Sequence, residues 1–223
     1  MGERYITIAQ PAFSYEQVLK KSRFIVALKR VKTEDEARAF IAQVTKENQR
    51  ANHNVWTYVL GRNNEVQRYS DDGEPSGTAG VPMLEVLKNN QLHDVVAVQT
   101  RYFGGIKLGA GGLIRAYAGT VAEAIAEVGL VEQVERTKLI VELEYHQFDA
   151  FKYWLAQNDL APQDVQYAEK LSVTVPALAD TVDWFIQQTL NQTKGQAVIK
   201  QDGTELFEVP FSKEITARTE TRC

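Results

Sequence analysis

The stretch from Tyr69 to Tyr117 contains most of the glycine in this chain and constrains its fold more than any other segment. Eight of the fourteen glycines lie between Gly73 and Gly112. Glycine loses more backbone entropy on folding than any other residue, and it permits positive φ angles and close approach between backbones. Such a concentration predicts a tightly turned segment that holds a ligand or partner.

This stretch divides into a polar turn, a strand, a glycine-rich segment and a helix. The acidic turn, Ser70–Gly80, has the sequence SDDGEPSGTAG and is rich in turn-forming residues. Residues 95–100 (VVAVQT) are apolar nearly throughout, which is typical of a central strand covered on both faces. The glycine cluster, residues 104–112 (GGIKLGAGG), precedes an amphipathic helix predicted over residues 113–129. Backbone N–H groups and a helix N-terminus bind anions in this setting.

Basic and aromatic residues flank the glycine cluster and would add charge and stacking surface to an anion site. The cluster is not a Walker loop, because Gly-Lys-Ser/Thr is missing, and it is not a dinucleotide fingerprint. The other interpretation is that the glycines only permit a tight crossing from strand to helix. The expected anion- or nucleic-acid-binding residues are Arg101, Tyr102, Gly104, Gly105, Lys107, Gly109, Gly111, Gly112 and Arg115.

A second candidate group consists of His53, Asp71, Asp72 and Glu74. These residues would bind Mg²⁺ or transfer a proton, although their spacing does not match a calcium loop. The alternatives are an ordinary turn for the acids and a packing role for the histidine. We expect the acidic turn and the glycine cluster to form two halves of one site. No serine stands in a nucleophile elbow, so no catalytic residue is assigned.

The remaining pattern predicts two α+β domains, residues 1–133 and 134–223, with a boundary near residues 131–135. In the first domain, strands are expected at residues 5–8, 22–31, 53–61, 66–70 and 95–100, with helices beginning after Thr33 and at Pro82 and Leu113. In the second, the order β-α-β-β-α-β from residue 137 is the split arrangement of a ferredoxin-like domain. A closing hairpin is expected at residues 196–200 and 206–209.

Composition restricts the class of protein. The chain is 44% hydrophobic and 24% charged, as in ordinary globular domains. Its single cysteine, Cys223, excludes an intrachain disulfide and a cysteine-based zinc site. The sequence shows neither a signal pattern nor a membrane-spanning apolar run, so a cytoplasmic location without membrane association is expected.

The net charge of −4 argues against a protein that coats nucleic acid generally. Residues 1–134 hold 16 Lys and Arg against 15 Asp and Glu, a balance of +1, whereas residues 135–223 hold 9 against 14, a balance of −5. A polyanion is therefore expected to bind the first part. No feature indicates DNA specificity or an oligomeric state.

Four segments carry a resemblance to a known family. They are Lys21–Ile25 (KSRFI), Ala51–Trp56 (ANHNVW), Ser70–Met83 and Arg101–Tyr117 (RYFGGIKLGAGGLIRAY). Together they resemble the Impact family in its bacterial, YigZ-type form, over about residues 1–130. The second half resembles the smaller domain of that family by the order of its elements.

The resemblance implies an N-terminal domain with the fold of the second domain of a small-subunit ribosomal protein, also found in domain four of elongation factor G and in small-molecule kinases. The C-terminal domain would resemble domain five of the same elongation factor. Eukaryotic Impact proteins regulate translation under amino-acid stress, which favours a regulatory or binding protein that contacts RNA, the ribosome or a translation factor. Two alternatives are an enzyme acting on a phosphorylated small molecule or nucleotide, and a protein-interaction module whose ferredoxin-like domain presents an acidic face.

Overall fold

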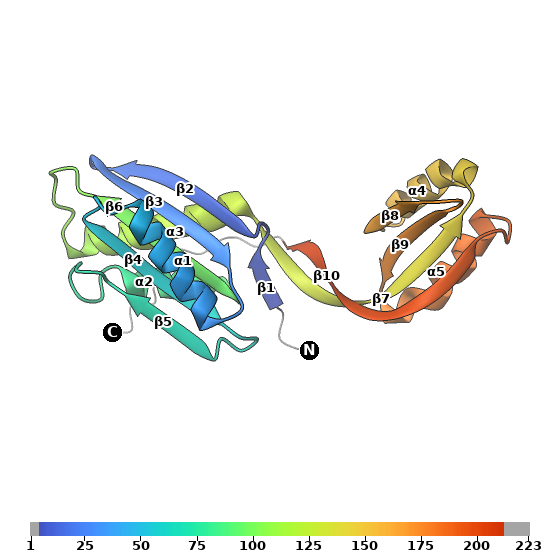
Figure 1. Ribbon diagram of the computed structural model, residues 1–223, viewed down its shortest axis with the longest axis horizontal. Coiled ribbons are helices and arrows are strands. Elements are labelled where there is room, and N and C mark those ends of the chain that lie inside the picture. Colours follow the sequence, from blue (N-terminus) through green and yellow to red (C-terminus); the bar gives the residue numbers. More distant parts are fainter. Residues whose placement is uncertain (1–4, 212–223) are drawn as a thin grey trace. The chain divides into compact units, whose positions relative to one another are not determined.

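The computed structural model describes residues 5–211, which form two compact α+β units (Figure 1). The first unit comprises residues 5–133 together with residues 209–211, and the second comprises Val134–Glu208. Two long strands, β7 (Leu130–Leu143) and β10 (Val198–Phe211), each have residues in both units. The predicted second domain extended to residue 223. Residues 209–211 instead belong to the first unit, and residues 212–223 lie outside the described residues.

The first unit is built on an antiparallel five-stranded sheet with the order β2-β3-β6-β4-β5. Its strands are β2 (Ala12–Leu19), β3 (Ser22–Arg30), β4 (His53–Leu60), β5 (Val66–Ser70) and β6 (Val95–Tyr102). The apolar strand β6 occupies the centre, as its composition predicts. Its register sets Arg101 opposite Phe24 of β3 and His53 of β4, which brings residues from three strands to one end of the sheet.

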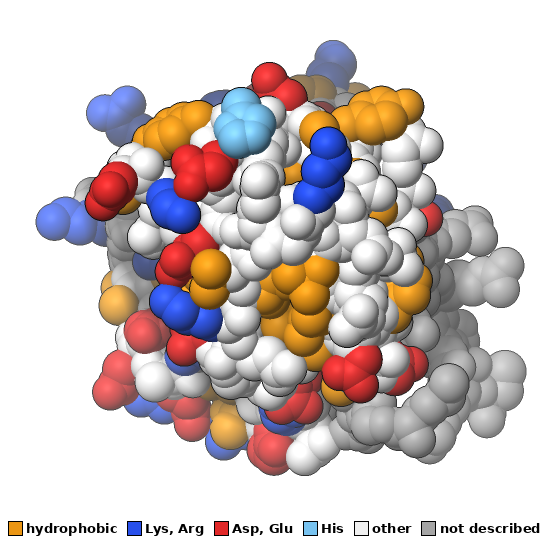
Figure 2. All heavy atoms as spheres, turned by 90° about the vertical axis from the view of Figure 1, so that its right-hand side faces the viewer, with side chains coloured by type: hydrophobic (Ala, Val, Ile, Leu, Met, Phe, Trp, Pro, Cys, Tyr) orange, Lys and Arg blue, Asp and Glu red, His pale blue; other side chains and the backbone are white. Residues whose placement is uncertain are grey.

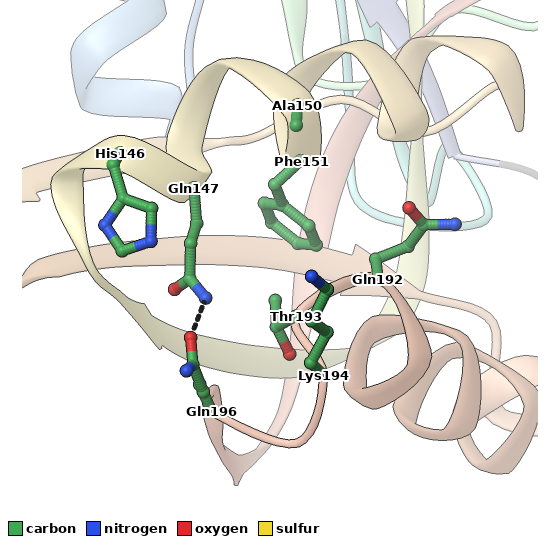
Figure 3. Close-up of a pocket in the computed structure, with 8 residues that line it drawn as sticks. All are labelled: His146, Gln147, Ala150, Phe151, Gln192, Thr193, Lys194 and Gln196. Carbon is green, nitrogen blue, oxygen red and sulfur yellow. Dashed lines mark hydrogen bonds between the residues drawn. The ribbon is translucent and has the colours of Figure 1, made fainter.

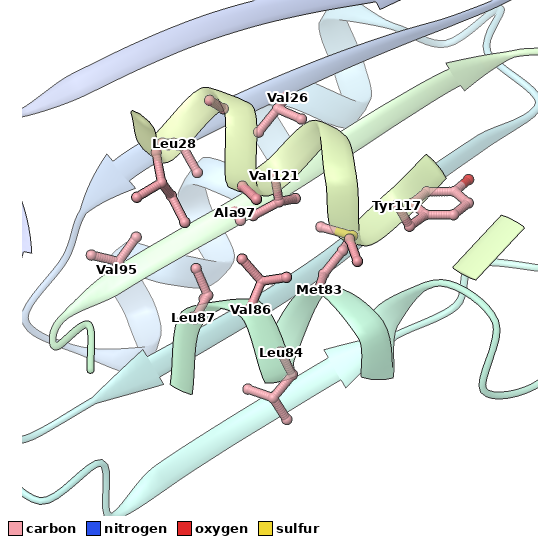
Figure 4. Packing of buried hydrophobic residues seen from close by; sticks show 14 of the residues in the cluster. Val26, Leu28, Met83, Leu84, Val86, Leu87, Val95, Ala97, Tyr117 and Val121 are labelled. Atoms are coloured by element: carbon pink, nitrogen blue, oxygen red, sulfur yellow. The ribbon is translucent and has the colours of Figure 1, made fainter. Parts of the chain in front are cut away.

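Helices cover both faces of this sheet (Figure 1). Helix α1 (Glu34–Glu47) lies on one face, and α2 (Gly80–Asn89) and α3 (Ala110–Val128) pack on the other. Apolar side chains from α2 and α3, among them Met83, Val86 and Val121, interdigitate with Val26, Leu28 and Ala97 of the sheet (Figure 4). Each such fully buried side chain contributes about 1.5–3 kcal/mol through the hydrophobic effect.

Helix α1 begins as the sequence predicts. The Thr33 hydroxyl accepts a hydrogen bond from the N–H of Glu36 at 3.2 Å. The Glu36 carboxylate accepts from the N–H of Lys32 at 2.7 Å, instead of the Thr33 N–H that a complete capping box would use. Strand β1 (Tyr5–Ile8) pairs antiparallel with residues 130–133 of β7.

The second unit has the ferredoxin-like order that its pattern predicts. Strand β7 is followed by η1 (Tyr145–Gln147), α4 (Phe148–Gln157), β8 (Asp164–Tyr167), β9 (Leu171–Ala177), η2 (Ala179–Thr181), α5 (Val182–Gln192) and β10. The strands align as β10-β7-β9-β8. The unit has its own core, in which Phe151 of α4 and Phe185 of α5 are almost completely buried.

Several elements differ from the predictions. Strand β2 was not expected, because it follows a proline and its exposed residues alternate with residues that are only partly buried. Strand β7 continues through the predicted boundary at residues 131–135, and a single strand, β10, replaces the predicted closing hairpin. Helix α2 begins two residues before Pro82. Helix α3 begins at Ala110, so Gly111 and Gly112 form its first turn and are not loop residues.

Candidate functional site

The acidic turn is shaped by its own carboxylates. Asp71 accepts hydrogen bonds from the N–H groups of Gly77 at 2.9 Å, Ala79 at 3.2 Å and Gly80 at 2.8 Å, so it gathers the backbone at the start of α2. The Asp72 carboxylate accepts from the N–H of Asn54 on β4 at 2.6 Å. Asp71 therefore fixes the turn to the start of α2, and Asp72 fixes it to the sheet.

These bonds place Glu74, the third acid, inside the protein. Its side chain is 3% exposed. One carboxylate oxygen, Oε1, accepts from Arg101 Nη1 at 2.6 Å and from the Tyr117 hydroxyl at 2.7 Å. Burial and the adjacent carboxylate both raise the pKa of the Tyr117 phenol, which therefore stays neutral and donates. Glu74 thus joins the acidic turn, the end of β6 and the first turns of α3.

His53 stands at the outer edge of this cluster. Its Nδ1 lies 2.7 Å from the carbonyl oxygen of Asp72, and its Nε2 lies 3.9 Å from Glu74 Oε1. A carbonyl oxygen only accepts, so Nδ1 donates to Asp72 and Nε2 is the ring nitrogen that faces Glu74. The imidazole is therefore the partly exposed member of a largely buried group.

The cluster also contains polar atoms without a partner. Arg101 Nε and both amide atoms of Gln99 are buried and make no hydrogen bond within the described residues. Gln99 and Arg101 are two positions apart on β6 and so face the same side of the sheet. The Arg101 guanidinium lies 5.5 Å from the ring centroids of Phe24 and Phe103. Its charge is thus enclosed between aromatic rings and Glu74.

The backbone geometry accounts for three glycines of the glycine cluster. A Cβ on Gly104 would stand 2.0 Å from the carbonyl oxygen of Lys21, so only glycine permits this approach to the β2–β3 turn. Gly105 and Gly109 have φ angles of +84° and +70°. Gly109 is the N-cap of α3, whose first turn contains no acidic residue. The N–H groups of that turn remain available toward solvent.

Four cations surround this end of the first unit. Lys107 and Arg115 are exposed, and so are Lys20 and Lys21, which form the two-residue turn between β2 and β3. A hollow of about 310 Å³ is lined by Lys20, Leu108, Gly112 and Arg115 among others. Within residues 5–211, none of the four cations forms an ion pair. The only acid that lines the hollow is Glu123, which accepts hydrogen bonds from Tyr15 and Gln17.

The turn of Lys20 and Lys21 was not identified as a functional element from the sequence. Both residues have positive φ, +45° and +65°, the signature of a type I′ hairpin turn. Asn-Gly is preferred there, since at positive φ the Cβ atom of most L-residues comes too close to a backbone carbonyl oxygen. Two lysines at these positions strain the backbone, and packing does not explain why they are present. Backbone strain of this kind is found at functional sites. Because β2 was not predicted from the sequence, the turn that joins it to β3 was not predicted either.

The structure therefore separates the predicted site residues into two groups. Arg101 belongs with Glu74 in the interior and is not a surface anion ligand, whereas Lys107, Arg115 and the glycines line the surface. Tyr102 packs under Arg23, with its hydroxyl donating to Asn48 at 2.9 Å. The buried group is Glu74 with Arg101 and Tyr117, and the exposed group is the basic end of the first unit; that the acidic turn and the glycine cluster form one site stays a prediction.

The geometry of the acidic turn favours the ordinary turn over the possible metal site. Asp71 and Asp72 direct their carboxylates at backbone N–H groups, and Glu74 is paired with Arg101. In the part of the chain that the structure describes, no group of three or more His, Cys, Asp or Glu side chains has an arrangement suited to a metal ion.

The second unit has a hollow of about the same volume, 310 Å³, between α4 and the segment after α5 (Figure 3). Gln147 donates to Gln196 at 2.7 Å, and this bond bridges the two segments. His146 and Lys194 also line this hollow. On the face of this unit shown in Figure 2, acidic and basic side chains are interspersed around a hydrophobic patch. This hollow has less positive charge than the basic end of the first unit.

Comparison with known proteins identifies the family. Residues 20–125 match the Impact N-terminal domain. The chain is 42% identical to the IMPACT family member YvyE of Bacillus subtilis (strain 168), with 90% of this chain and 92% of that protein covered. The chain belongs to the IMPACT family. Another member, YigZ of Escherichia coli (strain K12), is 37% identical, with 78% of this chain and 87% of YigZ covered.

A solved structure agrees with this assignment. A crystal structure described as that of a hypothetical protein is 31% identical and has a TM-score of 0.56, with 90% of this IMPACT-family chain and 98% of the other covered. The matched domain contains the acidic turn, the glycine cluster and the Lys20–Lys21 turn. Among the helices within residues 5–211, none has the length and apolar character that crossing a membrane requires.

Proposed function

We propose that this IMPACT-family protein is a translation-linked binding protein that contacts RNA through the basic end of its first unit. The surface consists of the Lys20–Lys21 turn, the glycine cluster and Arg115. The observation that supports the proposal best is the gathering of four exposed cations, without acidic partners among the described residues, around the N-terminus of α3.

The chemistry of this surface suits a phosphate backbone. Phosphates accept hydrogen bonds from lysine, arginine and free helix N–H groups, and such contacts give affinity without sequence specificity. The exposed side chains of Phe103, 44% accessible, and Ile106, 41% accessible, add apolar surface for unstacked bases. The acidic balance of the second half directs an RNA toward the first unit. The role requires a cytoplasmic location, which stays a prediction.

The buried cluster of Glu74, Arg101 and Tyr117 has a supporting part in this proposal. It fixes the end of β6 and the first turns of α3, between which the glycine cluster is held. Rigid support lowers the entropy lost when a flexible loop is ordered on binding. Catalysis is not needed for such a role.

The test is binding of the full-length protein to ribosomes and to single-stranded ribosomal RNA fragments at several salt concentrations. We expect affinity to fall steeply with salt, with a logarithmic slope of about −2 to −3 for three to four contacts, because each phosphate contact to a single strand contributes about 0.7. A triple variant, Lys20→Ala, Lys107→Ala and Arg115→Ala, should reduce that slope by about 2.

The matched control removes three exposed lysines of the second unit: Lys152→Ala, Lys170→Ala and Lys194→Ala. It changes the net charge equally, so it should leave the slope unchanged if the basic end is the binding surface. Equal decreases of the slope in the two variants would show that net charge alone causes the effect, which would contradict the proposal. Intact binding by the first variant would defeat it as well.

A further inference from the structure

A second candidate surface lies on the face of the first unit's sheet that carries α1. There α1 leaves β4 and β5 partly uncovered. A groove of about 750 Å³ is lined there by Arg38, Ile41, Ala42, Thr45, Lys46, Gln49, Trp56, Tyr58 and Arg68. One wall is a single face of α1, and the floor is the aromatic pair of β4 with Arg68 of β5. The basic end is on different residues, so the two surfaces can be tested separately.

The floor of the groove is held in a fixed arrangement. Trp56 and Tyr58 lie two positions apart on β4, with ring planes inclined by only 12° and centroids 5.8 Å apart. The Tyr58 hydroxyl donates to Glu34 Oε2 at 2.7 Å, which orients its buried ring. Trp56 is only partly buried and supplies the accessible aromatic surface of the groove.

The charged side chains that line the groove are all cations: Arg38, Lys46 and Arg68. Glu34 forms an ion pair with Arg38 at 3.4 Å and also interacts electrostatically with Arg68. Lys46 has no ion-pair partner within the described residues. Three cations around one carboxylate leave an excess of positive charge beside an aromatic ring.

We propose that this groove binds a short segment of single-stranded RNA, with a base stacked on Trp56 and phosphates held by Lys46 and Arg68. Aromatic rings interleaved with basic residues are the means by which proteins bind unpaired nucleotides. The aliphatic wall of Ile41 and Ala42 suits the second face of a base. The hydroxyl of Thr45 and the amide of Gln49 can reach polar edges of the base.

The length of the cationic wall favours a strand over a free nucleotide. Arg38 and Lys46 are eight residues apart on α1, which corresponds to about 12 Å along the helix. Cations so far apart suit phosphates spread along a strand better than the phosphates of one compact molecule. The apolar floor favours RNA over an acidic peptide, because base stacking uses an aromatic ring that carboxylates do not need.

The experiment uses the fluorescence of Trp56 in the full-length protein with Trp154→Phe and Trp184→Phe, so that one tryptophan reports. Oligoadenylate RNA of about eight nucleotides is titrated in, and AMP and an oligoglutamate peptide are titrated in parallel. We expect saturable quenching by the RNA, at concentrations at least tenfold below those at which AMP quenches. Far-ultraviolet circular dichroism verifies that the single-tryptophan protein is folded.

Two variants test whether binding in the groove causes the quenching. Lys46→Ala with Arg68→Ala should weaken the quenching titration at least tenfold, and the matched control Lys152→Ala with Lys194→Ala should leave it unchanged. The basic-end triple variant should retain the quenching amplitude at saturating RNA, so failure of the proposed function and failure of this inference are distinguishable. RNA binding without quenching, or no RNA binding at all, would overturn the inference. Equal quenching by AMP, or tighter binding of oligoglutamate that depends on Lys46 and Arg68, would also overturn it.

Discussion

At the scale of single residues, Glu74 is a buried carboxylate that links three segments of the first unit. It is the acceptor for the buried Arg101 guanidinium and the Tyr117 hydroxyl. Removing one partner of a buried pair leaves the other charge uncompensated, and this costs about 3–5 kcal/mol. We therefore expect Glu74→Gln to lower the free energy of unfolding by about 3 kcal/mol, measured by urea denaturation.

Glu16→Gln is the matched control for that substitution. Glu16 pairs with Arg23 at 2.7 Å, but both side chains are about half exposed and the pair is screened by solvent. We expect no clear change in unfolding for this variant. Comparable losses in the two variants would show that Glu74 has no special place in the fold.

The surroundings of Asp94 lead us to expect that the stability of the first unit depends on pH. Burial alone would raise the pKa of Asp94, but bonds from Lys32, Tyr5 and the Gly61 N–H outweigh burial and hold that pKa below its usual value. The unfolded chain therefore binds a proton at higher pH than the folded chain does. This contribution to stability is present above pH of about 4 and is lost as the pH falls through the folded pKa. Asp94→Asn should be less stable than the parent at pH 7, with a difference that shrinks in unfolding curves at pH 3.

The Tyr5 phenol gives the alkaline counterpart of the same cluster. Burial and the hydrogen bond to Asp94 raise the pKa of Tyr5 to about 12. The folded state retains this proton more strongly, so the contribution is complete below pH of about 10 and is lost above it. A parent protein whose stability did not change in either pH window would contradict the role of this cluster.

At the scale of elements, the sequence was most informative where one face is buried or a glycine is required. The central position of β6, the Thr33 cap of α1 and the end of α3 at Gly129 follow from apolar runs, capping residues and glycine chemistry. Strand β2 could not be found in this way, because its register comes from pairing with β3 and not from its own composition. The length of β10 likewise depends on its partner β7.

The candidate site shows the same limit. The sequence located the acidic turn and the glycine cluster, but not the burial of Arg101, which depends on its register opposite Phe24 and His53. Nor could it find the Trp56 groove, which is made by two strands and one face of α1. Contacts between distant segments decide both features, and a single sequence carries no direct signal of them.

The turn of Lys20 and Lys21 carries a prediction at this scale. Replacing it by Asn-Gly, with Lys20→Asn and Lys21→Gly, supplies the residues that a type I′ turn prefers. We expect the free energy of unfolding to rise by about 1 kcal/mol, because left-handed strain at non-glycine residues costs about that much. RNA binding should weaken, with a salt slope smaller by about 1.4 as two phosphate contacts are lost.

This double substitution separates binding from stability, since it moves the two in opposite directions. Urea denaturation and RNA titration on the same preparation are the measurements. A more stable variant that binds RNA normally would exclude the lysines from the binding surface. A less stable variant would show that the lysines are kept for the fold.

At the scale of the whole molecule, each unit has a hydrophobic core of its own. Met83 and Val121 belong to a core of the first unit, and Phe151 and Phe185 to that of the second. A chain with separate cores need not unfold in one step. The tryptophans divide in the same way, because Trp56 is in the first unit and Trp154 and Trp184 are in the second.

The tryptophans thus allow the two units to be followed separately during unfolding. In Trp154→Phe with Trp184→Phe, fluorescence reports the first unit, and in Trp56→Phe it reports the second. Adding Glu74→Gln should lower the urea midpoint reported by Trp56 by roughly 1–3 M, given a loss of about 3 kcal/mol and a denaturant slope of about 1–3 kcal/mol per M. The midpoint reported by Trp154 and Trp184 should not change, because Arg101 and Tyr117, which donate hydrogen bonds to Glu74, both belong to the first unit. If both midpoints moved together, the units would unfold as one cooperative body, and the strands β7 and β10 that have residues in both would be the elements that couple them.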